Sequence, residues 1–319
     1  TRCTSSAASD VYKRQCHLSY REYSFMDFNF QRTNYFFILS LGAMLIGFAP
    51  IFVKLSYLSP IAITFYRMLL ALPFIYMLNV VIHKTNVIKL KNKKTLFYSA
   101  LASLAFTVDL TLWHYSMKLT SVSNATIIVN SAPIFVAVLS FIVFKEKLSA
   151  NFFKSFLITY LGIFGLIYFS NNYTEGQLTG DFFCLVAALF YGTYLLIIGK
   201  LGNESSISII FYTTLFCCVF SIPIMLLENV PFMPINKFEW TNMFLLAFLC
   251  QFGGQFLITY GIGKISSSEG SIGLLMQPLT ATVLAAIIFN EILNFVQILF
   301  ILITFIGIYL SLIHISEPT

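Results

Sequence analysis

The sequence predicts an all-α integral membrane protein of about ten transmembrane helices, arranged as two inverted five-helix repeats. Three observations support this prediction: the composition, a series of long apolar runs, and an internal repeat with a register of 145 residues. Hydrophobic residues make up 58% of the 319 residues and charged residues only 10%, and the mean hydropathy is +0.84. Soluble domains carry roughly 25% charged residues. Lipid is therefore expected to be the solvent for most of this chain.

The apolar runs have the length that a membrane-spanning helix needs. A bilayer core about 30 Å thick requires about 20 residues at the helical rise. Strands of a membrane barrel would alternate polar and apolar residues, whereas 134–144 is apolar on every side. The short gaps between the runs predict that consecutive helices are antiparallel neighbours. The ten runs are approximately 35–55, 61–82, 95–117, 124–144, 152–170, 180–200, 206–228, 240–262, 270–289 and 294–313.

Loop charges predict the orientation. Five lysines fall within 84–94, in one polar gap between apolar runs, and cytoplasmic loops of membrane proteins collect Lys and Arg. We therefore expect both termini in the cytoplasm and the chain in the bacterial inner (plasma) membrane. The formal charge of +6 does not indicate nucleic acid, because the cations lie in loops and no nucleic-acid-binding module is present.

The two ends of the sequence are expected to lie outside the fold. Residues 1–15 and the tail 314–319 resemble translated sequencing-adapter sequence, which is left out of fold reasoning. Met26 is then the expected start within an N-terminal segment, 1–34. The predicted repeats span 35–170 and 171–313.

The repeat aligns without a gap when the sequence is shifted by 145 residues. Matches of Tyr, Pro, Glu and Gly are harder to obtain by chance than matches among aliphatic residues. A unit with an odd number of helices must re-enter the membrane with the opposite orientation, which is the inverted-repeat plan of many secondary transporters. The matched pairs include Tyr115 with Tyr260, Ser121 with Ser266, Pro133 with Pro278, Glu146 with Glu291, Thr159 with Thr304, and Gly162 with Gly307.

Two stretches carry a family resemblance. TSVSNATIIVNSAPIFVAVLSFIVFKEKL (120–148) and SSSEGSIGLLMQPLTATVLAAIIFNEIL (266–293) both show small residues at the entry, a proline within the helix, and Glu-x-Leu after its end. They resemble the repeat signature of the EamA family of the drug/metabolite transporter superfamily. The resemblance implies ten helices, cytoplasmic termini, a central cavity, and transport of small metabolites or drugs, often outward.

The predicted function is therefore a secondary transporter, expected to be an exporter, that works by alternating access without a cofactor. Its partners are a small-molecule substrate and membrane lipid, with protons and a second copy of the chain (a homodimer) as further candidates, and no nucleic acid. The alternative is a multipass membrane enzyme that acts on a lipid-linked substrate. No catalytic constellation or metal-binding motif supports that alternative.

Ionisable groups within apolar helices are costly and usually face a cavity or a partner. Arg67 is either a structural cation near the outer face or an anchor for a carboxylate or phosphate. Asp109, taken as the only deep carboxylate, either pairs with Arg67 or binds a cationic group or a proton. His114 can titrate near neutral pH but is expected to be a solvated residue near the helix end. Trp113 belongs either to an interfacial aromatic belt or to the cavity wall.

Uncharged polar residues supply further candidates for substrate binding. Gln251 and Gln255 are four residues apart, hence on one face of a helix. Asn130 precedes Pro133, and Gln277 precedes Pro278.

A proline removes one backbone hydrogen bond and opens a helix locally. Pro133 and Pro278 are therefore the candidate hinge or gate residues. The alternative for the amides is a bridge between helices. Glu146 and Glu291 are each expected to cap the helix that follows them or to place a negative charge at its N-terminus.

Overall fold

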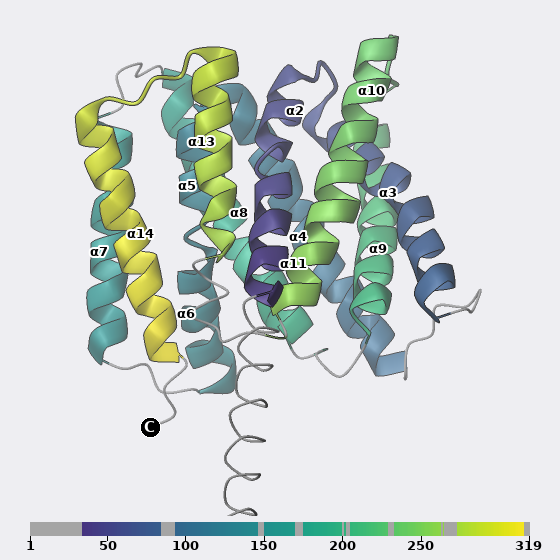
Figure 1. Ribbon diagram of the computed structural model, residues 1–319, viewed down its shortest axis with the longest axis horizontal. Coiled ribbons are helices and arrows are strands. Elements are labelled where there is room, and N and C mark those ends of the chain that lie inside the picture. Colours follow the sequence, from purple (N-terminus) through teal and green to yellow (C-terminus); the bar gives the residue numbers. More distant parts are fainter. Residues whose placement is uncertain are drawn as a thin grey trace, which may run out of the picture.

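The computed structural model describes residues 34–83, 93–145, 150–169, 175–199, 201, 205–228, 233–262, 264 and 273–315. All regular secondary structure within these ranges is helical. The predicted all-α fold class is confirmed to that extent. In Figure 1 the helices run roughly from top to bottom of the view and lie side by side and one behind another. The last helix, α14, ends at the bottom of the view, on the side where the helix over 34–46 begins.

The helices after residue 46 follow one another with short connections. In chain order they are α2 (Ala49–Leu55), α3 (Pro60–His83), α4 (Lys93–Leu119), α5 (Val122–Val129), α6 (Ala132–Phe144), α7 (Ala150–Tyr168), α8 (Glu175–Gly199), α9 (Ser206–Leu227), α10 (Lys237–Leu245), the π-helix η1 (Leu246–Gly254), α11 (Gln255–Ile262), α13 (Met276–Phe289) and α14 (Phe295–Ile315).

Seven helical segments of the described chain have the length and hydropathy to cross a bilayer, and three more apolar helices are shorter. The shorter ones are Phe153–Tyr168, Met276–Phe289 and Phe295–Gly307. Large apolar side chains lie exposed along these helices, among them Phe164, Ile287 and Leu302. Such a surface is expected where hydrocarbon, not water, surrounds the protein.

Three of the spans are interrupted. A turn at 47–48 separates the helix over 34–46 from α2, and residues 130–131 separate α5 from α6. The third turn is at Leu275, immediately before α13. Pro133 lies in the first turn of α6 and Pro278 in the first turn of α13, where the missing proline N–H leaves no hydrogen bond unmade. The prolines therefore begin new helical segments within a span.

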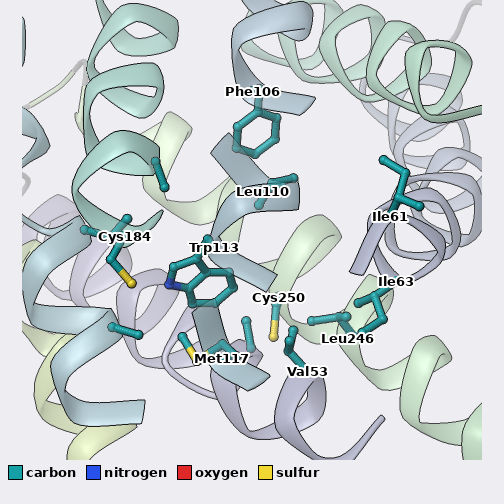
Figure 2. Close-up of a cluster of buried hydrophobic side chains, with 14 of the residues drawn as sticks. Val53, Ile61, Ile63, Phe106, Leu110, Trp113, Met117, Cys184, Leu246 and Cys250 are labelled. Carbon is teal, nitrogen blue, oxygen red and sulfur yellow. The ribbon is translucent and has the colours of Figure 1, made fainter. Parts of the chain in front are cut away.

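The core is centred on α4. This helix packs most extensively against α8 and also contacts α9 and α3, whereas α7 and α14 form a separate pair at the left of Figure 1. Figure 2 shows the largest buried cluster, in which Phe106, Leu110, Trp113 and Met117 follow one another along α4. Cys184 of α8 borders this row.

Glu291 does not cap the helix that follows it, so the expectation that this residue is a cap is wrong. The N–H of Asn294 donates to Gln297 Oε1 at 3.0 Å, and the N–H of Gln297 donates to Asn294 Oδ1 at 2.7 Å. This reciprocal capping box satisfies the start of α14. Glu291 is thus available to other partners. Glu146 lies outside the described residues.

Candidate functional site

A small cavity of about 50 Å³ lies between the helices, with polar and aromatic side chains on its wall. Five of the eight residues predicted to bind substrate face it. Two carry charge, two carry an amide, and the fifth is a tryptophan. The lining residues are Ile46, Arg67, Phe106, Asp109, Leu110, Trp113, Val129, Tyr191, Gln255 and Gln277.

Arg67 is held in place by a neutral side chain. It lies on α3 with only 3% of its surface exposed, and its Nε donates to Gln251 Oε1 at 3.1 Å. The amide nitrogen of Gln251 in turn lies 3.4 Å from Thr214 Oγ1 on α9. Gln251 therefore orients the guanidinium through this hydrogen bond and does not itself line the cavity. Arg67 lines the cavity together with a charged neighbour.

That neighbour is Asp109 on α4, a carboxyl with 5% exposure. Arg67 and Asp109 bring opposite charges to one buried space, where their attraction is stronger than in water. Together they can hold a molecule that carries both a negative and a positive group, since a guanidinium binds carboxylates and a carboxylate binds cationic groups.

Aromatic rings complete the wall. Trp113 lies one turn beyond Asp109 on α4 and is 5% exposed, so it belongs to the cavity and not to an interfacial belt. Tyr191 of α8 lies opposite, and its ring stacks on Tyr194 with centroids 6.0 Å apart. Phe106 stacks on the same Tyr194 at 4.5 Å. These rings present π faces that attract cations and flat apolar groups.

The two glutamines of the eighth predicted span have different surroundings because the helix changes its winding there. Gln255 follows η1, and its N–H bonds to the carbonyl of Cys250, five residues earlier. π-helical turns are rare and concentrate at functional sites. The winding lets Gln251 reach Arg67 while Gln255 faces the cavity. Sequence spacing alone placed both on one face.

Besides Gln251, two more of the predicted binding residues lie outside the cavity. His114 is fully buried and not solvated; its Nδ1 lies 3.1 Å from the carbonyl oxygen of Pro60 and 2.9 Å from Thr64 Oγ1. It joins α4 to the start of α3. Asn130 donates its side-chain amide to the carbonyl of Thr126 at 2.7 Å, within its own helix.

Three functional candidates were missed by sequence reasoning. Tyr191 and Phe106 lie in apolar runs, where an aromatic residue gives no signal of the side it faces. Asp181 of α8 is 1% exposed, so Asp109 is not the only buried carboxyl. Asp181 falls at the start of the predicted span over 180–200, and no role was predicted for it. Its position within the apolar run, followed by Phe182 and Phe183, was the available signal.

Polar contacts tie the segments together on the side where α2 ends. Lys54 and Glu291 form an ion pair with Nζ and Oε1 2.5 Å apart, and the N–H of Val122 donates to Glu291 Oε2 at 3.0 Å. Glu239 of α10 accepts from Ser56 Oγ and, at 3.1 Å, from the N–H of Tyr57. These bonds join α2, α5, α10 and the turn before α14 and hold these segments together on this side of the helices.

Metal binding has no support among the residues that the structure describes, where no group of three His, Cys, Asp or Glu side chains converges. The site's chemistry is that of charge and hydrogen bonding.

The profile of the EamA-like transporter family matches this chain twice, over residues 33–168 and 178–313. The chain belongs to the EamA-like transporter family. Membership places it among membrane transporters and not among enzymes, and it confirms the family predicted from the two signature stretches.

Named relatives of this EamA-like chain are distant. The uncharacterized transporter YetK of Bacillus subtilis is 22% identical over 64% of this chain and 64% of its own length. The S-adenosylmethionine uptake transporter of Rickettsia felis is 25% identical over 50% of this chain and 51% of its own length. The matches thus span less than two thirds of either relative. A protein of known crystal structure is similar over 90% of this chain and all of its own, with a TM-score of 0.65 at 12% identity, which shows the fold alone.

Proposed function

We propose that the chain is a secondary transporter that moves a small zwitterionic metabolite across the bacterial inner membrane by alternating access. The observation that carries this proposal is the pair Arg67 and Asp109, two side chains of opposite charge that line one buried cavity. Charged groups inside membrane proteins are costly and mark substrate or ion pathways. A carboxylate on the substrate would bind Arg67, and its cationic group would bind Asp109.

The rest of the wall suits such a substrate. Trp113 and Tyr191 can stack on a ring or on a cationic centre, and the amides of Gln255 and Gln277 can bond its polar edges. S-Adenosylmethionine, the substrate in the name of the Rickettsia felis relative, combines a zwitterionic amino-acid group, a sulfonium and an aromatic base. We include it, with α-amino acids, in the proposed substrate class.

The size of the cavity supports a cycle with more than one conformation. Binding sites for small molecules commonly measure about 300–1,000 Å³, whereas this cavity holds about 50 Å³. A metabolite therefore fits only after helices move apart. The contacts of Lys54 with Glu291 and of Ser56 with Glu239 must break for the side near α2 to open.

We propose that the two halves are inverted repeats and that the first helix of each half packs against the other half. A Cβ atom at Gly47 would lie 2.8 Å from the carbonyl oxygen of Gln277, and a Cβ at Gly192 would lie 3.0 Å from that of Ala132. The two contacts correspond in the 145-residue register, because Gly47 matches Gly192 and Ala132 matches Gln277. Close approach of a helix to the opposite half therefore recurs at equivalent positions.

The crossing of α7 and α14 supports the same symmetry. A Cβ at Gly162 would lie 2.6 Å from the N of Thr304, and a Cβ at Gly307 would lie 2.5 Å from the N of Thr159. Each glycine thus admits the backbone of the other helix, as small residues do in membrane helix pairs. A rigid pair of this kind is a suitable pivot for two rocking halves, with Pro133 and Pro278 as hinge positions beside the cavity.

The proposed membrane orientation follows the lysine-rich gap at 84–94 and places both termini in the cytoplasm. The side near Lys54 then faces outward. The family resemblance implies export, whereas the Rickettsia felis relative is named for uptake. Transport in both directions therefore has to be measured.

The test is counterflow with purified protein in proteoliposomes. Labelled S-adenosylmethionine, methionine and lysine are the probes, with glucose and inorganic phosphate as non-zwitterionic controls. We expect saturable exchange of at least one zwitterion from either side. Asp109→Asn should lower its apparent affinity at least about tenfold, because a charged hydrogen bond contributes roughly 1.5–3 kcal/mol.

The matched acidic control is Glu228→Gln. Glu228 accepts a hydrogen bond from the Tyr115 hydroxyl at 2.6 Å and does not line the cavity, so exchange should change by less than about twofold. Exchange of glucose or phosphate alone, or equal losses in the two variants, would contradict the proposal.

A further inference from the structure

A second buried carboxyl lies at the opposite end of the α4–α8 interface from Tyr191. Asp181 is within two turns of the start of α8, on the side where Lys54 and Glu291 form their ion pair. Only 1% of its surface is exposed. Gly180 brings this part of α8 close to the turn after α4, since a Cβ there would lie 3.1 Å from the N of Thr120. The carboxyl is therefore enclosed by protein and does not face lipid.

Its hydrogen bonding is incomplete for a carboxylate. Thr120 Oγ1 donates to Asp181 Oδ1 at 2.6 Å. Asn124, which is fully buried, lies beside the carboxyl, yet neither atom of its amide has a partner of standard geometry, and Asp181 Oδ2 has none either. A buried charge that lacks partners is expensive. A protonated Oδ2 could instead donate to the amide oxygen of Asn124, and these two oxygens would then each have a partner.

No cation compensates the carboxyl among the described residues. The nearest titratable side chain on α8 is Cys184, whose thiol bonds to Ser116 Oγ at 2.9 Å. Of the cationic groups near this end of α4, Lys118 donates to the carbonyl of Ser56 and His114 contacts the carbonyl of Pro60. The segments Val122–Val129 and Ala132–Phe144, which also pack on α8, contain no titratable residue.

The carboxyl also connects to the central cavity. Cys184 and Tyr191 follow Asp181 on one side of α8, and Ser116, Trp113 and Asp109 face them from α4. Ser116 donates to the carbonyl of Trp113 at 2.7 Å, and Figure 2 shows the nitrogen edge of Trp113 turned toward Cys184. The indole N–H has no partner in the described structure. A row of polar groups thus lies between the two carboxyls.

We propose that Asp181 is a proton-binding carboxyl, held by Thr120 and Asn124, that exchanges a proton with the outer side when that side opens. The proton comes from water and returns to water, and no other bond forms or breaks. The proposal that Asp181 binds a proton is supported by its surroundings alone and does not depend on the proposed transport function. Its use as the coupling ion rests on the proposed transport function.

The test needs no substrate. The whole protein in liposomes is treated with dicyclohexylcarbodiimide, which modifies protonated carboxyls in apolar surroundings, and the labelled peptides are identified by mass spectrometry. We expect label on Asp181 at low pH that is lost as the pH rises, and no label in Asp181→Asn. Replacement of KCl by NaCl at constant ionic strength should leave the labelling unchanged.

A second variant keeps the test decisive if Asp181→Asn does not fold. Thr120→Val removes a donor that favours the charged carboxylate, so the loss of label should shift upward by about one pH unit. The control is Thr111→Val on α4, whose hydroxyl bonds only its own helix, to the carbonyl of Thr107 at 2.7 Å; it should cause no shift.

Absence of label at every pH would show a permanently charged structural anchor, and protection by Na⁺ at constant pH would show a sodium site. Either result would overturn the proposal. Because labelling does not depend on transport, its outcome is separate from that of the counterflow experiment.

Discussion

The two halves of the chain share their close backbone contacts but contribute different chemistry to the cavity. Arg67 and Asp109 both come from the first half, while the amides of Gln255 and Gln277 come from the second. The residues 145 positions after Arg67 and Asp109 are a tyrosine and a glycine. One half therefore supplies charge, and the other supplies uncharged hydrogen-bonding groups.

The difference follows from what surrounds each kind of residue. A glycine such as Gly162 lies where another backbone approaches, so any side chain would collide. A residue that faces a cavity has no such restriction, because the open space accommodates side chains of different sizes and shapes. Contacts between backbones therefore remain alike in the two halves, whereas side chains at the cavity are free to diverge. An asymmetric substrate needs such an asymmetric site.

The largest effect is expected when a charged residue of the first half is removed from the cavity wall. Arg67→Gln should weaken binding of the proposed zwitterionic substrate about 100-fold, because it removes the anchor for the carboxylate and leaves Asp109 buried without its cation. Tyr212→Phe, at the matching position of the second half, should change binding less than about threefold. Binding of labelled substrate to purified, monodisperse protein measures both. Similar losses in the two variants would show that the halves contribute equally.

A smaller effect tests the contacts that the halves share. Gly162→Ala and Gly307→Ala should each destabilise the protein by about 1–3 kcal/mol, since each new methyl group would overlap a threonine of the facing helix. Gly176→Ala is the control, because its Cβ would meet nothing nearer than 3.7 Å. Thermal unfolding in detergent compares them. A large loss for only one of the two crossing glycines would argue against the proposed symmetry.

The smallest effect concerns two helix ends in the same register. Lys145 and Asn290 follow α6 and α13 with φ of 55° and 56°. Asparagine adopts this left-handed conformation more readily than lysine. Lys145→Gly should therefore stabilise the protein by about 1 kcal/mol and Asn290→Gly by less.

Chemical unfolding of the two glycine variants provides the measurement, and Lys145→Ala, which keeps the strain, is the control. If Lys145→Ala stabilised as much as Lys145→Gly, the backbone conformation would not be the cause.

Much of the candidate site was predictable because intramembrane polar residues are few. Arg67, Asp109 and Trp113 stand out in apolar runs, and the structure places all three on one cavity. His114 and Asn130 were equally conspicuous but bond to nearby backbone carbonyls instead. Sequence cannot separate these cases, because both a cavity and a carbonyl can satisfy a polar side chain.

The partners of the acidic residues also lay beyond sequence reasoning. Glu291 bonds to Lys54 and to the N–H of Val122, which are 237 and 169 residues away. Asp181 is buried because Gly180 lets α8 approach the turn after α4. Such contacts depend on which helices meet, and no local pattern encodes that.

The sequence by itself determined that this is a helical membrane protein of the EamA-like family. Hydropathy and run length are local properties of the sequence, and they determine which segments can span the bilayer. The signature stretches recur at one register of 145 residues. Only the tertiary structure decided which polar side chains share the cavity, where η1 turns Gln251 toward Arg67, and that Asp181 is enclosed. Those outcomes depend on the rotation and closeness of neighbouring helices, which packing sets only once the whole chain has folded.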